Sequence, residues 1–379
     1  MNNTSNKNTD LFDWWSPVMT GTELDLITEA INNNYINEGP KTQELQQQIA
    51  DTLSVKHALL VTSGTTAIYL ALRALGIGYG DEVLVPDITF IATANAVSAT
   101  GARPVLCEVN IPDSSFDINF ALRHVNDKTK AIIPVHVSGR NLISKQLVDF
   151  AKQNNLFIVE DAAEALHSGK PKEFLGTLGD VGCFSLSPNK LITTGQGGIL
   201  VTNNSEIYDA ARRYKNQGRD HIGSGFREIH LTTGENMRFT DLQAAVGLAQ
   251  WPSLKDRASK QRKMGKIYQS VLSGSKNLKL CSFDIDNQQT PLWFDVLVDD
   301  RESFSDWMLK HKFQVRPYWY PISTQKPYHD QTGRTPKAKY ISEHAVWLPS
   351  SMILTDEQIN LAAQLTLEYV KNNPLTPYE

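Results

Sequence analysis

Two segments, LFIVEDAAEA at residues 156–165 and FSLSPNKLITTGQGG at residues 184–198, decide how we interpret the chain. The apolar residues 156–159 predict a buried strand over 156–160, and Asp161 follows at its carboxyl end. Lys190 comes 29 residues after Asp161, and a turn rich in threonine and glycine follows it. An amine and a carboxylate suit a site that holds an aldehyde covalently. Lysine and aspartate are common surface residues, so this interpretation needs further parts.

The composition is that of an ordinary soluble globular protein. The chain has 379 residues, of which 41% are hydrophobic and 21% charged, and its formal net charge is −4. A chain of this length can bury a large core and is expected to form two domains. Because the basic excess of a nucleic-acid-binding protein is missing, we expect neither nucleic acid nor an anionic membrane as a partner.

The cysteines and the apolar runs indicate the compartment. Cys107, Cys183 and Cys281 are odd in number and widely spaced, as expected of reduced core thiols in a cytosolic protein. No apolar run approaches the roughly 20 residues needed to span a bilayer. The polar first ten residues lack the zones of a signal peptide. These features predict a cytoplasmic protein.

A turn of small residues offers a candidate phosphate site. The apolar residues 58–61 predict a short strand, and Ser63, Gly64 and Thr65 then lead into an amphipathic helix. Free backbone amides, hydroxyls and the positive end of a helix dipole suit a phosphate dianion. The alternative is that Ser63 or Thr65 serves only as the N-cap of this helix.

Phe90 lies at a second switch from strand to helix. Residues 82–85 predict a strand that Pro86 ends, and Phe90 precedes the next helical run. Ligands of open α/β sheets bind at the carboxyl ends of the strands, so Phe90 is placed to stack on a flat ring. The alternative is a core phenylalanine. His136, which closes another apolar run, is interpreted as a structural histidine.

Apolar runs alternate with amphipathic helices through the first two thirds of the chain, and a helix near 118–126 is among those expected. This alternation predicts a largely parallel sheet that is covered on both faces. Pro252 breaks the last helix of this region, so we place a domain boundary there. We expect an N-terminal arm at 1–16, a large domain at 17–251 and a small domain at 252–379.

The arm and the small domain have few predicted elements. Trp14 and Trp15 are expected to dock the arm on the folded body. A capping box of Thr355 and Gln358 announces the last helix. The elements expected in the small domain are helices over about 254–272, 302–311 and 356–371 and strands at 292–298 and 313–316.

Together, these parts predict a site for pyridoxal phosphate. This cofactor needs an amine to hold its aldehyde, a carboxylate to keep its ring nitrogen protonated, and a cup for its phosphate. Lys190, Asp161 and the turn at 63–65 supply all three. We expect the carboxylate to maintain the ring as an electron sink and the lysine to act as base and acid.

The residues that carry a wider resemblance are 63–65, 76–86, Thr89, Phe90, 133–136, 160–165, 184–190, 193–198, 236–245, Arg316, Pro317, Tyr320 and Pro321. With these motifs the chain, from about residue 17 onward, resembles the DegT/DnrJ/EryC1/StrS family of pyridoxal phosphate-dependent sugar aminotransferases. It is most similar to the perosamine-synthase-like members, which aminate C4 of a nucleotide-linked 4-keto-6-deoxy sugar. L-glutamate is the amino donor that the resemblance implies.

The resemblance also implies a fold and a set of site residues. The fold is α/β of aminotransferase fold type I, with a mostly parallel seven-stranded sheet in the large domain and a smaller C-terminal α/β domain. Lys190 is implied to bind the aldehyde and Asp161 the ring nitrogen. The implied cofactor contacts are Gly64, Thr65, Phe90, Asp161, Glu164, Ser185, Lys190 and Asn236. The implied substrate contacts are Tyr320, Arg316 and His221, and no metal is expected.

Asn236 matches a family asparagine that reaches the cofactor phosphate of the neighbouring subunit, so the resemblance implies a homodimer with shared active sites. Two positions depart from the common pattern. Glu164 stands where many members have a glutamine, as it does in perosamine-type members. Gln196 stands where the family has a glutamate, which bears on how the active-site loop is held. Further substrate candidates in loops are Arg219, His230 and Tyr318.

Three other functions were weighed. The family's keto-sugar dehydrases have a histidine in place of the lysine, and Lys190 argues against that reaction. A nucleotide-sugar-binding protein without catalysis would not need both Lys190 and Asp161. A nicotinamide-dependent reductase is disfavoured because the glycine fingerprint that opens its first helix is missing.

Overall fold

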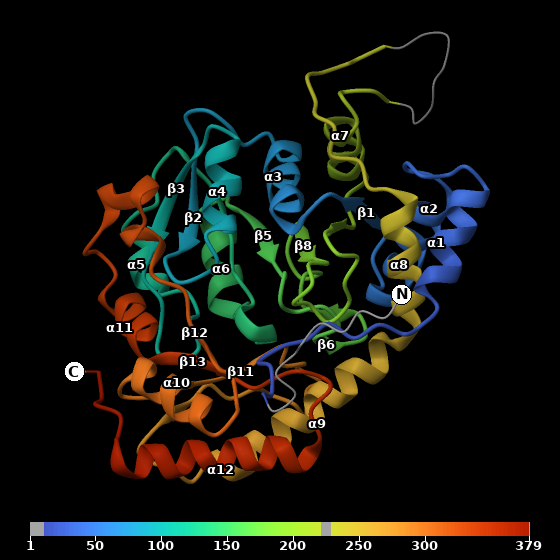
Figure 1. Cartoon of the computed structure of the whole chain (residues 1–379). Coiled ribbons are helices and arrows are strands. Elements are labelled where there is room, and N and C mark those ends of the chain that lie inside the picture. Colours follow the sequence, from blue (N-terminus) through green and yellow to red (C-terminus); the bar gives the residue numbers. More distant parts are fainter. Residues whose placement is uncertain (1–10, 221–228, 379) are drawn as a thin grey trace.

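The computed structural model describes residues 11–220 and 229–378. A large sheet has seven strands in the order β1-β9-β8-β5-β4-β2-β3, and a small sheet has four in the order β10-β11-β13-β12. In Figure 1 the large sheet lies above the small one. The strands of the large sheet are β1 (His57–Val61), β2 (Glu82–Pro86), β3 (Arg103–Cys107), β4 (Thr129–Ile132), β5 (Phe157–Asp161), β8 (Val181–Ser185) and β9 (Gly198–Thr202). Of these seven, only β9 runs antiparallel to its neighbours, so the predicted fold class is confirmed.

Helices cover both faces of the large sheet because successive side chains of each strand point to opposite sides. On one face, Leu59, Val61 and Leu200 share a core with α3 (Gly64–Ala74), α4 (Ala92–Ala99) and α7 (Ser205–Lys215). On the other face, Leu60 and Ile199 share a core with α2 (Pro40–Leu53). The remaining helices on that part of the chain are α1 (Glu23–Asn32), α5 (Ile118–Leu122), α6 (Lys145–Gln153) and α8 (Asp241–Gln250).

The small sheet is antiparallel throughout and has its own core. Its strands are β10 (Lys279–Leu280), β11 (Phe294–Leu297), β12 (Arg316–Pro317) and β13 (Ala345–Leu348). Its helices are α9 (Leu254–Leu272), α10 (Arg301–Lys310), α11 (Pro336–His344) and α12 (Asp356–Asn372), and α9 and α12 run beneath it in Figure 1. Because α9 begins at Leu254, we propose Pro252 as the boundary between the domains.

Several predictions about elements need correction. The helix expected over 118–126 spans only Ile118–Leu122. The strand expected at 313–316 is wrong, since β12 begins at Arg316 and Phe313 only forms an isolated bridge with Phe12. The sequence reasoning also missed β13, the strand that β11 and β12 flank, and the short hairpin of β6 (Gly169–Lys170) and β7 (Glu173–Phe174). The predicted capping box of α12 is present.

The N-terminal segment docks as predicted, through its tryptophans. The Trp14 ring lies 5.0 Å from that of Trp293 and 6.2 Å from that of Trp347. Trp15 Nε1 donates a hydrogen bond of 3.2 Å to the carbonyl of Pro188. The segment therefore bridges the small sheet and the loop that carries Lys190.

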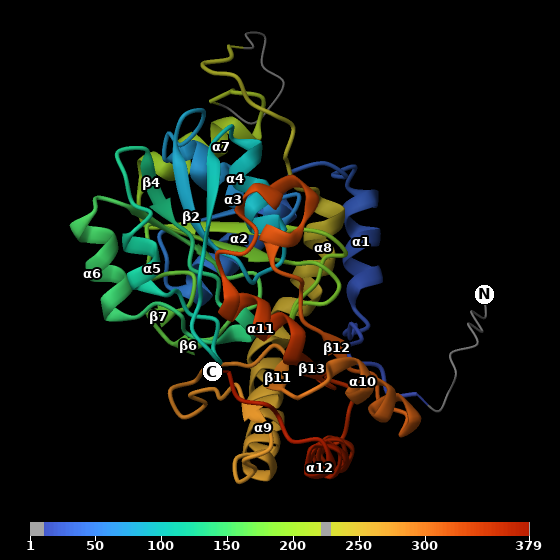
Figure 2. The same cartoon turned by 90° about the vertical axis from the view of Figure 1, so that its left-hand side faces the viewer.

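After β12, the chain returns to the large sheet as two short 3-10 helices, Ile322–Thr324 and Lys326–Gln331, and then α11, which Figure 2 shows between the two sheets. The buried Asp87 accepts hydrogen bonds from Ser323, at 2.7 Å from its amide and 2.6 Å from its hydroxyl. The side-chain amide of Gln331 bonds to the backbone of β3, at 2.9 Å from the Leu106 nitrogen and 3.0 Å to the Pro104 oxygen.

Cys107, Cys183 and Cys281 are buried free thiols, in agreement with the sequence. Within residues 11–220 and 229–378, no helix combines the length and apolar character that crossing a bilayer would need.

Candidate active site

A cavity of about 310 Å³ opens at the carboxyl ends of β1, β2, β5 and β8. This volume falls within the range of small-molecule sites. The residues predicted from the sequence that line it are Gly64, Thr65, Phe90, Asp161, Glu164, Ser185, Lys190 and Arg316. Segments that lie more than 250 residues apart in the chain thus meet in one cavity, as expected for the ligand edge of an α/β sheet.

Lys190 lies in the loop between β8 and β9. Its amide donates to the Ser187 carbonyl at 3.1 Å, and the loop is closed by the bond from the Leu186 amide to the Gly197 carbonyl at 2.9 Å. The Lys190 amine lies 3.6 Å from Glu164 Oε1 and 4.8 Å from the centre of the Trp293 ring. Burial lowers the pKa of Lys190, although the two neighbouring carboxylates act in the opposite direction.

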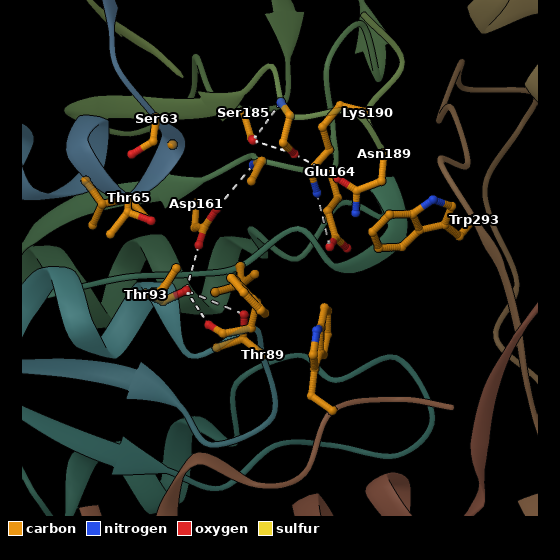
Figure 3. A pocket seen from close by; sticks show the side chains of 18 of the residues that line it. Ser63, Thr65, Thr89, Thr93, Asp161, Glu164, Ser185, Asn189, Lys190 and Trp293 are labelled. Atoms are coloured by element: carbon orange, nitrogen blue, oxygen red, sulfur yellow. Dashed lines mark hydrogen bonds and ion pairs between the residues drawn. The ribbon is translucent and has the colours of Figure 1, made fainter. Parts of the chain in front are cut away.

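Asp161 ends β5, and its carboxylate is held from two sides. Thr93 on α4 donates its hydroxyl to Asp161 Oδ2 at 2.7 Å, and the Ala163 amide donates to Oδ1 at 3.2 Å, as Figure 3 shows. Burial raises the pKa of Asp161, and these two bonds and the Lys190 charge oppose the rise. A positively charged ring nitrogen placed against this carboxylate would lower its pKa further.

The neighbouring Glu160 is fully buried and fixes the end of β5. Its carboxylate accepts the amides of Gly176, Leu178 and Gly179 at 2.7, 2.6 and 2.5 Å. His136 Nε2 lies 2.8 Å from the same carboxylate, so the structural role predicted for this histidine agrees with its position. Four contacts to one carboxylate hold the backbone that carries Asp161.

The turn before α3 forms one end of the cavity. The Ser63 hydroxyl accepts a hydrogen bond from the Thr66 amide at 3.1 Å. Ser63 is therefore the N-cap of α3, as the alternative interpretation of this turn predicted. Gly64 and Thr65 nevertheless line the cavity, and a Cβ at Gly64 would lie 3.1 Å from Ser185 Cβ. In Figure 3, Ser63 and Thr65 lie on the side opposite Trp293. The candidate phosphate cup and the tryptophan therefore lie at opposite ends of the cavity.

Glu164 lies between the lysine and the turn after β4. Its Oε2 accepts the Ser138 amide at 2.8 Å, while Oε1 faces Lys190. Burial raises the pKa of Glu164, and the Lys190 charge and the Ser138 amide oppose this rise. The Glu164 carboxylate therefore faces the lysine directly.

Phe90 and Gln196 also line the cavity. Phe90 is 54% exposed, so the alternative of a core residue is wrong. The Gln196 carbonyl, rather than its side chain, ties the loop, because it accepts from Thr194 Oγ1 at 2.7 Å and from Gln243 Nε2 at 2.8 Å.

Other predicted residues lie outside the cavity wall. Tyr320 is 62% exposed beside Arg301, whose guanidinium carbon lies 5.1 Å from the ring centre. Tyr318 is buried and donates its hydroxyl to Asp295. Asn236 accepts from Arg238 Nε at 3.1 Å, away from the cavity of its own chain. His221 lies outside the described residues.

Arg219 and His230, the other two loop candidates, lie next to each other. They form an isolated antiparallel bridge, and Arg219 donates to Asn216 at 3.1 Å. His230 Nδ1 lies 2.7 Å from the Gln217 carbonyl. Neither residue belongs to the lining of the cavity.

Sequence reasoning assigned no role in the site to several residues of the cavity wall, among them Thr93, Trp293 and Trp319. The sequence does carry a signal for Thr93, which lies three residues after Phe90. This spacing is about one helical turn and places both side chains on the same side of the chain. No local pattern distinguishes Trp293, since it lies just before β11 of the small sheet and reaches the cavity only through tertiary packing.

The donor set fits pyridoxal phosphate. The aldehyde needs an amine, which is buried here. The ring nitrogen needs a carboxylate, and the buried one here accepts two hydrogen bonds. The phosphate needs a helix N-terminus with hydroxyls, which the turn before α3 provides. The absence of a side chain at Gly64 keeps the cup open, because a Cβ there would press on Ser185.

Known proteins give an independent comparison. The profile of the DegT/DnrJ/EryC1/StrS aminotransferase family matches residues 17–365. GDP-perosamine synthase of Escherichia coli O157:H7 is 33% identical over 349 residues, which cover 91% of this chain and 94% of that protein. GDP-perosamine synthase of Vibrio cholerae is 32% identical over 355 residues, with coverage of 91% and 95%. The crystal structure of S. venezuelae DesV matches with a TM-score of 0.86 at 28% identity, covering 92% of this chain and 94% of that one.

Proposed function

Because the chain belongs to the DegT/DnrJ/EryC1/StrS family and is a pyridoxal phosphate-dependent sugar aminotransferase, we propose that it transfers the amino group of L-glutamate to C4 of a nucleotide-linked 4-keto-6-deoxy sugar. The observation that carries this proposal is the meeting of Lys190, Asp161 and the turn at Gly64 in one cavity. The two perosamine synthases and the carboxylate at Glu164 support the 4-keto sugar as acceptor.

We assign the cofactor contacts as follows. Lys190 would hold the aldehyde, Asp161 the ring nitrogen, and Phe90 one face of the ring. Gly64, Thr65 and Ser185 would hold the phosphate. When bound, the cofactor serves as the electron sink for the carbon that carries the transferred nitrogen.

The residues of the chain would then handle the protons. Burial lowers the pKa of Lys190 and so favours its neutral amine. The neutral amine can accept a proton at Nζ. It would take a proton from the donor carbon and return one to the acceptor carbon. Glu164, 3.6 Å away, would stabilise the ammonium formed in between. Arg316, which also lines the cavity, is our candidate for binding the carboxylate of the glutamate donor.

We also propose a homodimer in which Asn236 completes the partner's site. The support is that Asn236 lies outside the cavity of its own chain although it matches a cofactor contact of the family. Co-purified dimers of a Lys190→Ala chain and an Asn236→Ala chain test this directly. If the sites are shared, one site of each mixed dimer is intact and active. If Asn236 acts within its own chain, no site of the mixed dimer is intact.

The function itself is tested with a panel of GDP-, UDP- and dTDP-linked 4-keto-6-deoxy sugars incubated with L-glutamate. We expect an amino sugar by mass spectrometry, formed together with 2-oxoglutarate in equal amounts. The position of the new amine is read by NMR. A dehydrated sugar without nitrogen would instead support a dehydrase, and no product from any member would refute the proposed acceptor. Lys190→Ala protein serves as the control without transfer.

A further inference from the structure

Ser138 occupies an unusual place in the turn after β4. Its φ of 56° lies in the left-handed region, which is strained for a serine. All of its polar groups are used. The amide donates to Glu164 Oε2 at 2.8 Å, the carbonyl accepts the Leu292 amide at 2.8 Å, and the hydroxyl accepts from Trp347 Nε1 at 2.9 Å. One residue thus joins the active site to the small sheet.

A buried ion pair supports this turn from the small sheet. Arg140, two residues further on, donates to Asp295 of β11 at 2.5 and 2.7 Å. The two side chains are 4% and 0% exposed. Asp295 also accepts the Tyr318 hydroxyl, and its Oδ2 lies 3.5 Å from Ser138 Oγ. Gly139 packs closely against the backbone before β11, because a Cβ there would lie only 2.2 Å from the Thr290 carbonyl oxygen.

We propose that Ser138, Arg140 and Asp295 are positioning residues that hold the Glu164 carboxylate in front of Lys190, so that the small sheet sets the charge beside the cofactor. A buried ion pair usually contributes little net stability relative to apolar residues, so its geometry is the better reason for its presence. The strained conformation of Ser138 has the same explanation, since it directs the amide at Glu164. This inference rests on the proposed roles of Lys190 and Glu164.

The charges that face Glu164 come from three elements. Lys190 approaches from the loop after β8, Asp161 from β5 and Asp295 from β11. Burial raises the pKa of Glu164, and the Ser138 amide is the backbone donor that opposes the rise. If the turn loosens, Glu164 takes up a proton more readily. The nitrogen at Lys190 then loses a neighbouring negative charge and releases its own proton at lower pH.

The test uses the absorption spectrum of the cofactor-loaded enzyme as a function of pH. In Arg140→Met protein, we expect the midpoint of the spectral transition to fall by roughly one unit, the effect on the nitrogen of losing one neighbouring negative charge. We expect the dissociation constant for pyridoxal phosphate, measured by titrating the cofactor-free protein, to rise as well. Arg140→Lys, which keeps the charge, should shift the midpoint less.

Two backgrounds separate positioning from general damage. Glu164→Gln protein has no carboxylate to position. The double variant Glu164→Gln/Arg140→Met should therefore have the same midpoint as Glu164→Gln alone. Arg301→Met removes another buried guanidinium of the small domain, one that bonds to the carbonyls of Tyr318 and Ser342, and should lower stability without moving the midpoint.

A shift that persists in the Glu164→Gln background, or one of equal size in Arg301→Met, would overturn the inference. So would an unchanged midpoint in Arg140→Met. If the wild-type protein shows no cofactor absorption, or Lys190→Ala retains it, the assigned role of Lys190 fails instead, and the two failures are therefore distinguishable.

Discussion

Replacing Thr93 with valine isolates the contribution of one hydroxyl to the active site. Thr93 is fully buried and donates to Asp161 Oδ2 at 2.7 Å. Valine has nearly the same shape, so the main loss is one hydrogen bond to a charged group, about 1.5–3 kcal/mol. This corresponds to a rise of about one to two units in the pKa of Asp161, which burial already raises.

The sign follows from the form of Asp161 that binds the ring nitrogen. Only the ionised carboxylate pairs with a protonated ring, so activity falls as pH drops through the pKa of Asp161. We expect Thr93→Val to move the acid limb of the kcat profile to higher pH by about one unit and to weaken cofactor binding about tenfold. The profile is measured with saturating donor and acceptor, and the affinity by titration of cofactor-free protein.

Thr100→Val is the matched control, because Thr100 caps the end of the same helix and its hydroxyl bonds only to nearby backbone. It should leave both the acid limb and the cofactor affinity unchanged. The reasoning fails if Thr93→Val has an acid limb and a cofactor affinity equal to those of the control, since the hydroxyl would then not support Asp161.

Three further changes probe the site and its frame. Gly64→Ala places a Cβ 3.1 Å from a neighbouring Cβ in the phosphate cup, so we expect weaker binding of pyridoxal phosphate by titration, whereas Gly274→Ala, with open space around it, should bind normally. Glu160→Gln removes the charge that accepts three backbone amides and turns one of its two accepting oxygens into a donor, so we expect urea unfolding to show a loss of about 3 kcal/mol. The exposed Glu44→Gln, in contrast, should fall within about 0.5 kcal/mol of wild type. Lys190→Ala should lose the absorption of covalently bound cofactor while its affinity for inorganic phosphate at the cup remains, and retained absorption would contradict its role.

Local patterns predicted the large domain well. Each strand of the large sheet is a short apolar run, and the turn at Ser63 and the pair at Asp161 follow such runs directly, so periodicity and chain order place them at one edge. The part of the site that approaches from the small domain was harder to predict. Arg316 was expected only through the family resemblance, and Trp293 and Trp319 were missed.

The physical reason is that these residues reach the cavity through pairing between distant strands. β13 was missed because its four residues follow α11 without a turn signal, yet it pairs with both β11 and β12. Without that strand, the sequence gives no indication that Asp295 lies beside Arg140. Buried polar pairs between segments of this kind leave no periodic pattern, so only the folded chain reveals them.

Gln331 has a consequence for the behaviour of the chain during folding. β3 is an edge strand of the large sheet, and the unpaired backbone groups of an edge strand can pair with strands of other molecules. The Gln331 amide bonds to the Leu106 nitrogen and the Pro104 oxygen, as a neighbouring strand would, and Pro104 itself has no N–H to offer. Gln331 therefore covers part of the edge of the large sheet at β3. A chain that ended before Gln331 would leave this edge free to pair with other molecules and to aggregate.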